Sequence, residues 1–210
     1  MLIVCALGIE RLALRAGRDR TGAGPPVTVV RTGMGARRAE RTVREALADP
    51  RLRPAAVVAA GFCAGLAPGM RPGDVVVADE TRHASGATPC TGVAPMAEAV
   101  RRALPGARIH TGPLTGSDHI VRGPERALLR ATGAIGADME SAATLLTAVT
   151  LTAVTGGARP VAAVRVVVDA PEHELIRIGT VRGGLSAVRV LRAVVPAFQE
   201  WHRSSQLPRR

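Results

Sequence analysis

The chain has 210 residues, 47% of them hydrophobic, and a formal net charge of +11 at pH 7. This length and apolar content allow one sizeable core, which predicts a single domain over residues 1–210. No apolar run reaches transmembrane length without interruption, and no basic leader precedes the N-terminal apolar residues, so we expect a cytoplasmic protein.

The basic residues and the cysteines limit which partners and which metal or disulfide sites are expected. All 28 basic residues are Arg, which indicates a general bias toward Arg, although the charge can attract phosphates, nucleic acid or an anionic membrane. Two Phe, one Trp and no Tyr leave little for bases to stack on, so we expect no specific nucleic-acid partner. Cys5, Cys63 and Cys90 have neither CxxC nor metal-ligand spacing, which predicts reduced thiols and no metal site.

The first quarter of the chain predicts two strands, each followed by a helix. The strands cover residues 2–7 and 27–31, and the helices run to about residues 15 and 48. Glu10 lies just past the first strand, where a solvated first-turn carboxylate and a functional group are equally good interpretations. Gly33 and Gly35 either let the backbone approach a phosphate or sugar or simply form a tight turn. A dinucleotide-binding fingerprint fails, because Arg38 occupies its third glycine position.

A third strand over residues 55–60 leads into the sequence GFCAG, which has the spacing of a nucleophile elbow with Cys63 as nucleophile. An elbow requires a helix directly after it, and the prolines and glycines at positions 68, 69, 72 and 73 argue against one. Close backbone packing is therefore favoured. The alternative is a hydrolase that uses Cys63 together with Asp169 and either His173 or His202.

The remaining sequence predicts further strands and helices. Strands are predicted over residues 74–80, 108–114 and 161–168, and helices over 96–104, 122–132, 142–154 and 185–201, the last with a kink at Pro196. Loops or turns are predicted over residues 83–95, 115–119 and 172–180, the last as a mobile loop. His119 lies in the polar turn, where its residue type alone favours a surface position.

The polar sequence from Asp138 to Ser141 lies between a short apolar segment and a long helix. Such a junction points side chains and free N–H groups into the crevice at one end of an α/β sheet. On these residues alone, the favoured interpretation is that Asp138 or Ser141 caps the helix while Glu140 complements its dipole. The strand over residues 161–168 delivers Asp169 at its end, and two carboxylates at one sheet edge indicate a site.

Three segments together resemble the nucleoside phosphorylase and nucleosidase superfamily, over roughly the whole chain: GFCAGLAPGMRPGDVVVAD (61–79), ADMESA (137–142) and RVVVD (165–169). Within it the chain is most similar to the hopanoid-associated phosphorylases, which implies release of adenine from adenosylhopane. Nucleosidases of the methylthioadenosine/S-adenosylhomocysteine type and futalosine hydrolases are close relatives. The resemblance implies a three-layer αβα fold with a central mixed sheet, in a homodimer that cleaves a purine N-glycosidic bond without a cofactor.

The resemblance also implies catalytic roles for two residues. By matched position, Asp169 protonates the departing purine, and Glu10 falls near the position that nucleosidases use to activate water. An Asp can act as the acid only if burial raises its pKa from about 3.9 toward the working pH. Asp169 follows an apolar strand, which places it for such burial.

Substrate-binding roles follow from the resemblance in the same way. Glu140 holds the ribose hydroxyls, and Met139 packs on the sugar. His119 and Ile120 fall where the family contacts the base, and Phe62 is a further substrate-binding candidate.

The position of phosphate is the point where this sequence departs from the family. Family phosphorylases commonly place an Arg three residues before the position of Phe62, where this chain has Ala59. Inorganic phosphate as co-substrate would then rely on Gly8, Gly33, Gly35 or a nearby Arg. Phosphorolysis and hydrolysis both stay open.

Two expectations concern the Arg-rich surface. A basic nucleic-acid-binding module is an alternative that predicts steeply salt-dependent binding. Peripheral contact with an anionic membrane is compatible with the enzyme interpretation, because a lipid-linked nucleoside would reside there.

Overall fold

The computed structural model describes residues 1–18, 26–153, 158–171 and 180–205. The strands in these ranges are β1 (Leu2–Cys5), β2 (Thr28–Arg31), β3 (Val57–Gly65), β4 (Val75–His83), β5 (Gly86–Pro89), β6 (Ile109–Gly116), β7 (Gly136–Asp138) and β8 (Val161–Asp169). The helices are α1 (Gly8–Arg18), α2 (Ala36–Ala48), α3 (Val93–Ala103), α4 (Glu125–Ala131), α5 (Ser141–Ala153), α6 (Thr180–Ala193) and α7 (Val195–Ser205).

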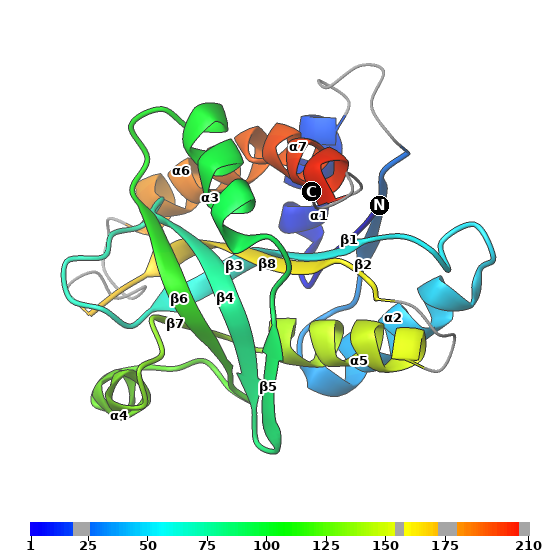
Figure 1. Cartoon of the computed structure of the whole chain (residues 1–210). Helices are drawn as coiled ribbons and strands as arrows, with labels where there is room; N and C mark the ends of the chain where they lie inside the picture. Colours follow the sequence, from blue (N-terminus) through cyan, green and yellow to red (C-terminus); the bar gives the residue numbers. More distant parts are fainter. Residues whose placement is uncertain (19–25, 154–157, 172–179, 206–210) are drawn as a thin grey trace.

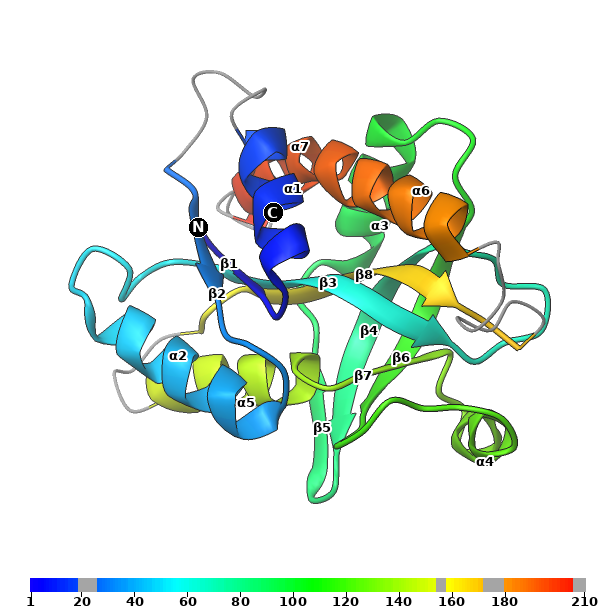
Figure 2. The same cartoon turned by 180° about the vertical axis from the view of Figure 1, so that it is seen from behind.

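The strands form one mixed sheet that closes on itself in the middle. Along the order β2-β1-β3-β7-β6-β4-β5, β8 bridges β3 in parallel and β4 in antiparallel orientation. β3, β8, β4, β6 and β7 therefore form a closed ring. Helices α1, α3, α6 and α7 cover one face of the sheet, and α2 and α5 cover the other (Figures 1 and 2). This confirms the expected αβα arrangement around a central mixed sheet.

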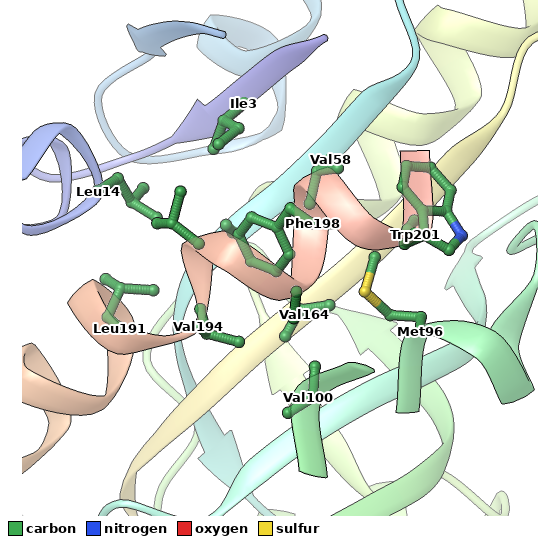
Figure 3. Close-up of a cluster of buried hydrophobic side chains, with 14 of the residues drawn as sticks. Ile3, Leu14, Val58, Met96, Val100, Val164, Leu191, Val194, Phe198 and Trp201 are labelled. Atoms are coloured by element: carbon green, nitrogen blue, oxygen red, sulfur yellow. The ribbon is translucent and has the colours of Figure 1, made fainter. Parts of the chain in front are cut away.

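The two central strands, β3 and β8, are buried on both faces. Val58 and Val164 pack with Phe198 in the cluster beneath α1, α3, α6 and α7 (Figure 3). Val57 and Ala163 belong to the cluster beneath α2 and α5. A strand that is covered on both sides needs apolar residues at consecutive positions, not at alternate ones. The apolar run that ends at Asp169 is explained by this double burial.

The segment 83–95 was predicted as a loop, which is wrong for residues 86–89 and 93–95, because they form a strand and the start of a helix. β4 continues to His83 and turns at Gly86 into the edge strand β5, and α3 begins at Val93. Pro89 is compatible with β5 because an edge strand does not use every N–H for pairing. Pro95 lies in the first turn of α3, where the N–H has no intrahelical partner.

The closing segment forms two helices, where the sequence predicted one kinked helix. α6 ends at Ala193 and α7 begins at Val195, so Pro196 occupies the second position of a new helix, where it is tolerated. The mobile loop predicted over residues 172–180 lies outside the described residues except for Thr180, which begins α6. Within the described ranges, no helix combines the length and apolarity needed to cross a bilayer.

Gly17 allows α1 to approach the C-terminal helices closely. A Cβ at this position would overlap the backbone oxygen of Arg192 and the side chain of Val195. Although Ala is the better helix former by about 1 kcal/mol, we expect Gly17→Ala to lower the free energy of unfolding by about 1–3 kcal/mol through overpacking. Denaturant unfolding measures the change.

Gly8, in the first turn of the same helix, provides the control. A Cβ there would meet its nearest neighbour, Arg31 Nη1, at an ordinary 3.6 Å. Gly8→Ala should therefore leave stability unchanged. A Gly17→Ala protein as stable as the wild type would contradict the close packing of α1.

Candidate active site

A cavity of about 350 Å³ is built from the carboxyl ends of β1, β3, β7 and β8 and the segments that follow them. Its volume is typical of small-molecule sites. Of the residues singled out in the sequence, these line it: Glu10, Phe62, Cys63, His119, Ile120, Asp138, Met139, Glu140 and Asp169. Gly8, Gly33 and Gly35 do not line it. Gly35 instead lines a neighbouring cavity of about 770 Å³, which shares Met34, Ser117 and Met139 with the first.

Asp169 reaches the cavity through an irregularity in β8. Cys63 pairs with Val167, whereas the next residue of β3, Ala64, pairs with Asp169, so Val168 is an extra residue in β8. Such bulges redirect the side chains beside them. Asp169 is 3% exposed and forms part of the cavity wall.

Arg126 of α4 forms a buried ion pair with Asp169. Its Nη2 lies 2.7 Å from Asp169 Oδ2, and its Nη1 donates to the Gly65 carbonyl oxygen at 3.0 Å. Both side chains are 4% exposed. A paired guanidinium favours the ionised form of a carboxyl group. Burial of Asp169, which the sequence predicted, is therefore accompanied by an opposing charge that the sequence did not reveal.

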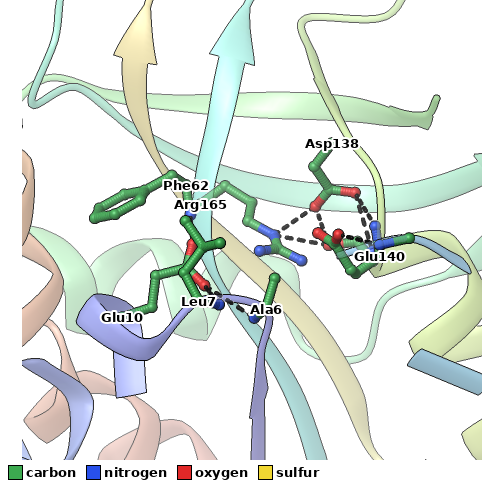
Figure 4. A network of polar contacts seen from close by, with 9 residues as sticks. Ala6, Leu7, Glu10, Phe62, Asp138, Glu140 and Arg165 are labelled. Carbon is green, nitrogen blue, oxygen red and sulfur yellow. Dashed lines mark hydrogen bonds and ion pairs between the residues drawn. The ribbon is translucent and has the colours of Figure 1, made fainter. Parts of the chain in front are cut away.

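Arg165 lies at the centre of a second buried charge cluster (Figure 4). Its Nε contacts Asp138 Oδ2 at 2.5 Å and donates to Ser141 Oγ at 2.8 Å, and Arg165 is 1% exposed. Asp138 Oδ1 also accepts the backbone N–H of Ser141 at 2.9 Å, which caps α5. The capping role considered for Asp138 is thus present, and the same carboxylate also neutralises Arg165.

Glu10 is held at the cavity wall by three backbone N–H groups. Its Oε2 accepts from Ala6 at 2.9 Å and Leu7 at 2.8 Å, and its Oε1 accepts from Phe62 at 2.7 Å. Burial raises the pKa of Glu10, an effect that Arg165 and these hydrogen bonds only partly offset. In Figure 4 the Arg165 side chain lies between Glu10 on one side and Asp138 with Glu140 on the other.

Glu140 is buried beside the same guanidinium. Its Oε1 accepts the backbone N–H of Gly35 at 2.7 Å. Burial raises the pKa of Glu140, with Asp138 and Glu10 adding to the effect and Arg165 opposing it. Three carboxylates therefore surround the single guanidinium of Arg165, and a cation is favoured in this part of the cavity.

His119 lies at the surface, as its residue type favours, and it also lines the cavity. Its side chain is 59% exposed, and its ring nitrogens lie 2.5 Å from Asp118 and 3.0 Å from Glu125. The hydrogen bonds to Asp118 and Glu125 raise the pKa of His119, which favours an imidazolium ion at the rim.

The glycine amides proposed for phosphate are engaged within the protein. Gly33 N–H donates to the Ala6 carbonyl oxygen at 3.1 Å, and Gly35 N–H donates to Glu140. Gly8 begins α1, and Ala59, at the family's Arg position, is fully buried in β3. No arrangement of three or more potential metal-ligating His, Cys, Asp or Glu side chains occurs in the part of the chain that the structure describes.

The environment of Cys63 opposes a nucleophilic role. Burial raises the pKa of the thiol, and the negative charge of Asp138 adds to this, whereas a nucleophile needs the thiolate. His202 lies in α7 and does not line the cavity, and His173 lies outside the described residues.

Two residues that organise the site were missed as participants. Arg165 was visible as a charged residue within an apolar strand, a signal that indicates a buried charge with a partner. Arg126 gave no signal, because it is one of many arginines and its partner lies 43 residues away.

Comparison with protein families and solved structures gives one consistent picture. The family model for the phosphorylase superfamily matches residues 14–195. No curated protein matches the sequence significantly.

Solved structures share the fold at low sequence identity. A 5′-methylthioadenosine/S-adenosylhomocysteine nucleosidase from Neisseria meningitidis, in complex with methylthio-immucillin-A, has 18% identity and a TM-score of 0.73, with 97% of this chain and 98% of that chain covered. A putative nucleosidase of the same kind from Borrelia burgdorferi, bound to adenine, has 16% identity and a TM-score of 0.76, with coverage of 97% and 99%. The futalosine hydrolase of Helicobacter pylori has 12% identity and a TM-score of 0.72, with 97% of each chain covered.

The buried Arg126–Asp169 pair predicts a large stability effect. Arg126→Met removes the guanidinium partner of a buried carboxylate, which should lower the free energy of unfolding by about 3–5 kcal/mol. Chemical denaturation measures the change. Arg130→Met, on the exposed side of the same helix, is the matched control and should change stability by less than about 0.5 kcal/mol. Equal effects of the two substitutions would argue against the pair.

Proposed function

Because the chain belongs to the phosphorylase superfamily and is therefore an enzyme that cleaves glycosyl bonds, we propose that its reaction is cleavage of the N-glycosidic bond of an adenine nucleoside. The observation that carries this proposal is the single cavity that contains Asp169 together with Glu10 and Glu140. A glycosyl transfer needs an acid for the leaving group and stabilisation of a cationic sugar, and this set of side chains supplies both.

The leaving purine is a poor anion, so it must gain a proton as the bond breaks. Asp169 is the acid in this proposal, and such proton transfer contributes about two to four powers of ten in rate. Arg126 binds Oδ2 of Asp169 and favours its ionised form, so the proposal requires that Asp169 takes up a proton before it acts on the base.

The ribose develops oxocarbenium character as the bond breaks. Glu140 holds the ribose hydroxyls, Met139 packs on the sugar, and the carboxylates around Arg165 stabilise the positive charge. Ile120 and Phe62 provide apolar contacts for the base, with His119 at the rim.

We assign hydrolysis, with water as the acceptor of the ribosyl group and Glu10 as the base that activates it. A phosphate ion would enter a site lined by Glu10, Glu140 and Asp169, where charge repulsion disfavours it. The amides of Gly33 and Gly35 are already used, and Ala59 offers no positive charge.

A substituent on the 5′ carbon fits the neighbouring cavity of about 770 Å³. The two cavities share Met34, Ser117 and Met139, so a group that leaves the sugar site can continue into the larger space. A bulky 5′ group such as that of adenosylhopane is the substrate class we propose. Methylthioadenosine/S-adenosylhomocysteine and futalosine are the alternatives. Contact of the Arg-rich surface with an anionic membrane would give access to a lipid-linked nucleoside.

The decisive experiment is a panel of purine nucleosides assayed with and without inorganic phosphate. We expect adenine release from 5′-substituted adenosines at a rate that does not depend on phosphate, with the 5-substituted ribose and no 5-substituted ribose 1-phosphate as the sugar product. Chromatography of the base and sugar products measures both.

Asp169→Asn is the control for this panel. It should lower base release by about 10²–10⁴-fold while circular dichroism shows a folded protein, because the amide keeps an oxygen acceptor for Arg126. Base release at the wild-type rate would refute the acid assignment, and strict dependence on phosphate would refute hydrolysis.

The raised pKa of Glu10 predicts how kcat/KM decreases at acidic pH. A general base must be ionised, and burial raises the pKa of this group. The value of kcat/KM should therefore fall as the pH decreases through that raised pKa, above the ordinary glutamate value of about 4.3. Glu10→Gln should lower kcat/KM by about 10²–10⁴-fold at every pH above the raised pKa of Glu10. A full-rate Glu10→Gln enzyme, or an acidic limb at or below the ordinary value, would remove Glu10 as the base.

A further inference from the structure

The glycine turn after β2 has a contact that its expected role in phosphate binding does not explain. The backbone N–H of Gly35 donates to Oε1 of Glu140 at 2.7 Å, across 105 residues of sequence. Glu140 is 7% exposed. Within the described part of the chain, this N–H is the only hydrogen-bond donor to the Glu140 carboxylate, since Arg165 acts on it only through its charge.

We propose that Gly35 is a positioning residue whose backbone N–H orients Glu140 toward the ribose hydroxyls, and that it thereby sets the preference for ribonucleosides over deoxyribonucleosides. This inference rests on the proposed function of Glu140. With Oε1 fixed by Gly35, Oε2 is directed to the vicinal hydroxyls, and the carboxylate need not lose rotational freedom when substrate binds.

The turn is fixed in place by the strand that also holds Glu10. Thr32 N–H donates to the Cys5 carbonyl oxygen at 2.9 Å, and Gly33 N–H donates to Ala6 at 3.1 Å. The backbone N–H groups of Ala6 and Leu7 in turn donate to Glu10. One short segment after β1 therefore supports both carboxylates. Its N–H groups donate to Glu10, and the carbonyl oxygen of Ala6 accepts from the turn that holds Glu140.

Glycine is required at position 35 by its backbone conformation. Gly35 has φ +99° and ψ 152°, a combination that residues with a side chain adopt only under strain. A Cβ at this position would meet no heavy atom within 4 Å. Any effect of Gly35→Ala must therefore come from a change of backbone direction, which turns the N–H away from Glu140, and not from crowding.

Gly106 offers a matched control. It has φ +90°, and a Cβ there would also meet nothing within 4 Å, but it lies in the turn between α3 and β6 and lines neither cavity. Gly35→Ala and Gly106→Ala both place a side chain at a positive φ in an open position. They differ in whether the N–H holds a carboxylate of the site.

The test compares kcat/KM for a 5′-substituted adenosine and for its 2′-deoxy analogue. We expect Gly35→Ala to reduce the ribose-to-deoxyribose ratio by about tenfold or more, in line with loss of a hydrogen bond to a charged group. Gly106→Ala should keep the wild-type ratio. In a Glu140→Gln background, Gly35→Ala should cause no further change in the ratio.

The outcomes separate this inference from the proposed function. A wild-type enzyme that cleaves no purine nucleoside would remove both. If the wild type is active and the ribose-to-deoxyribose ratio falls in Glu140→Gln but not in Gly35→Ala, only the role of Gly35 is overturned. The role of Glu140 then stands.

A second measurement avoids substitution of the glycine. Amide hydrogen exchange in the wild type should show Gly35 protected, and Glu140→Ala should remove this protection while the Gly33 amide, bonded to Ala6, stays protected. Unchanged protection of Gly35 in Glu140→Ala would overturn the proposal.

Discussion

The site depends on one buried positive charge, the guanidinium of Arg165 in the middle of β8. A buried charge without a partner is costly, and Arg165 is compensated by direct contact with Asp138 and by the nearby charges of Glu140 and Glu10. In return, it allows three carboxylates to share a small volume. The result is a cavity that keeps an excess of negative charge without losing the fold that surrounds it.

The closed ring of strands explains why these charges meet. β3 and β8 are covered on both faces, and apart from Arg165 in the middle of β8 their polar residues lie toward their carboxyl ends, where the cavity lies. The extra residue in β8 turns Asp169 into that cavity, and α4 approaches from outside the ring with Arg126. One arginine therefore pairs with Asp169, the proposed acid, and another lies among Asp138, Glu140 and Glu10.

Backbone amides complete the site without adding charge. Three N–H groups hold Glu10, and the N–H of Gly35 holds Glu140. Because these donors belong to β3 and to turns that β1 holds in place, they are oriented before any substrate arrives. The glycine turn was predicted as an anion site, and the anion that its Gly35 N–H binds is the side chain of Glu140 from the same protein.

The sequence alone predicted the strands other than β5 from local apolar periodicity, and its short contiguous motifs, through the family they resemble, predicted the αβα class and the acidic residues at the sheet edge. The hairpin at residues 83–95 and the break before Pro196 were misjudged, since proline is permitted at edge strands and in first turns that only the tertiary structure defines. The partners of the carboxylates came from the tertiary structure as well. Arg126 meets Asp169 across 43 residues and Gly35 meets Glu140 across 105, and no local pattern encodes a contact that chain closure brings about.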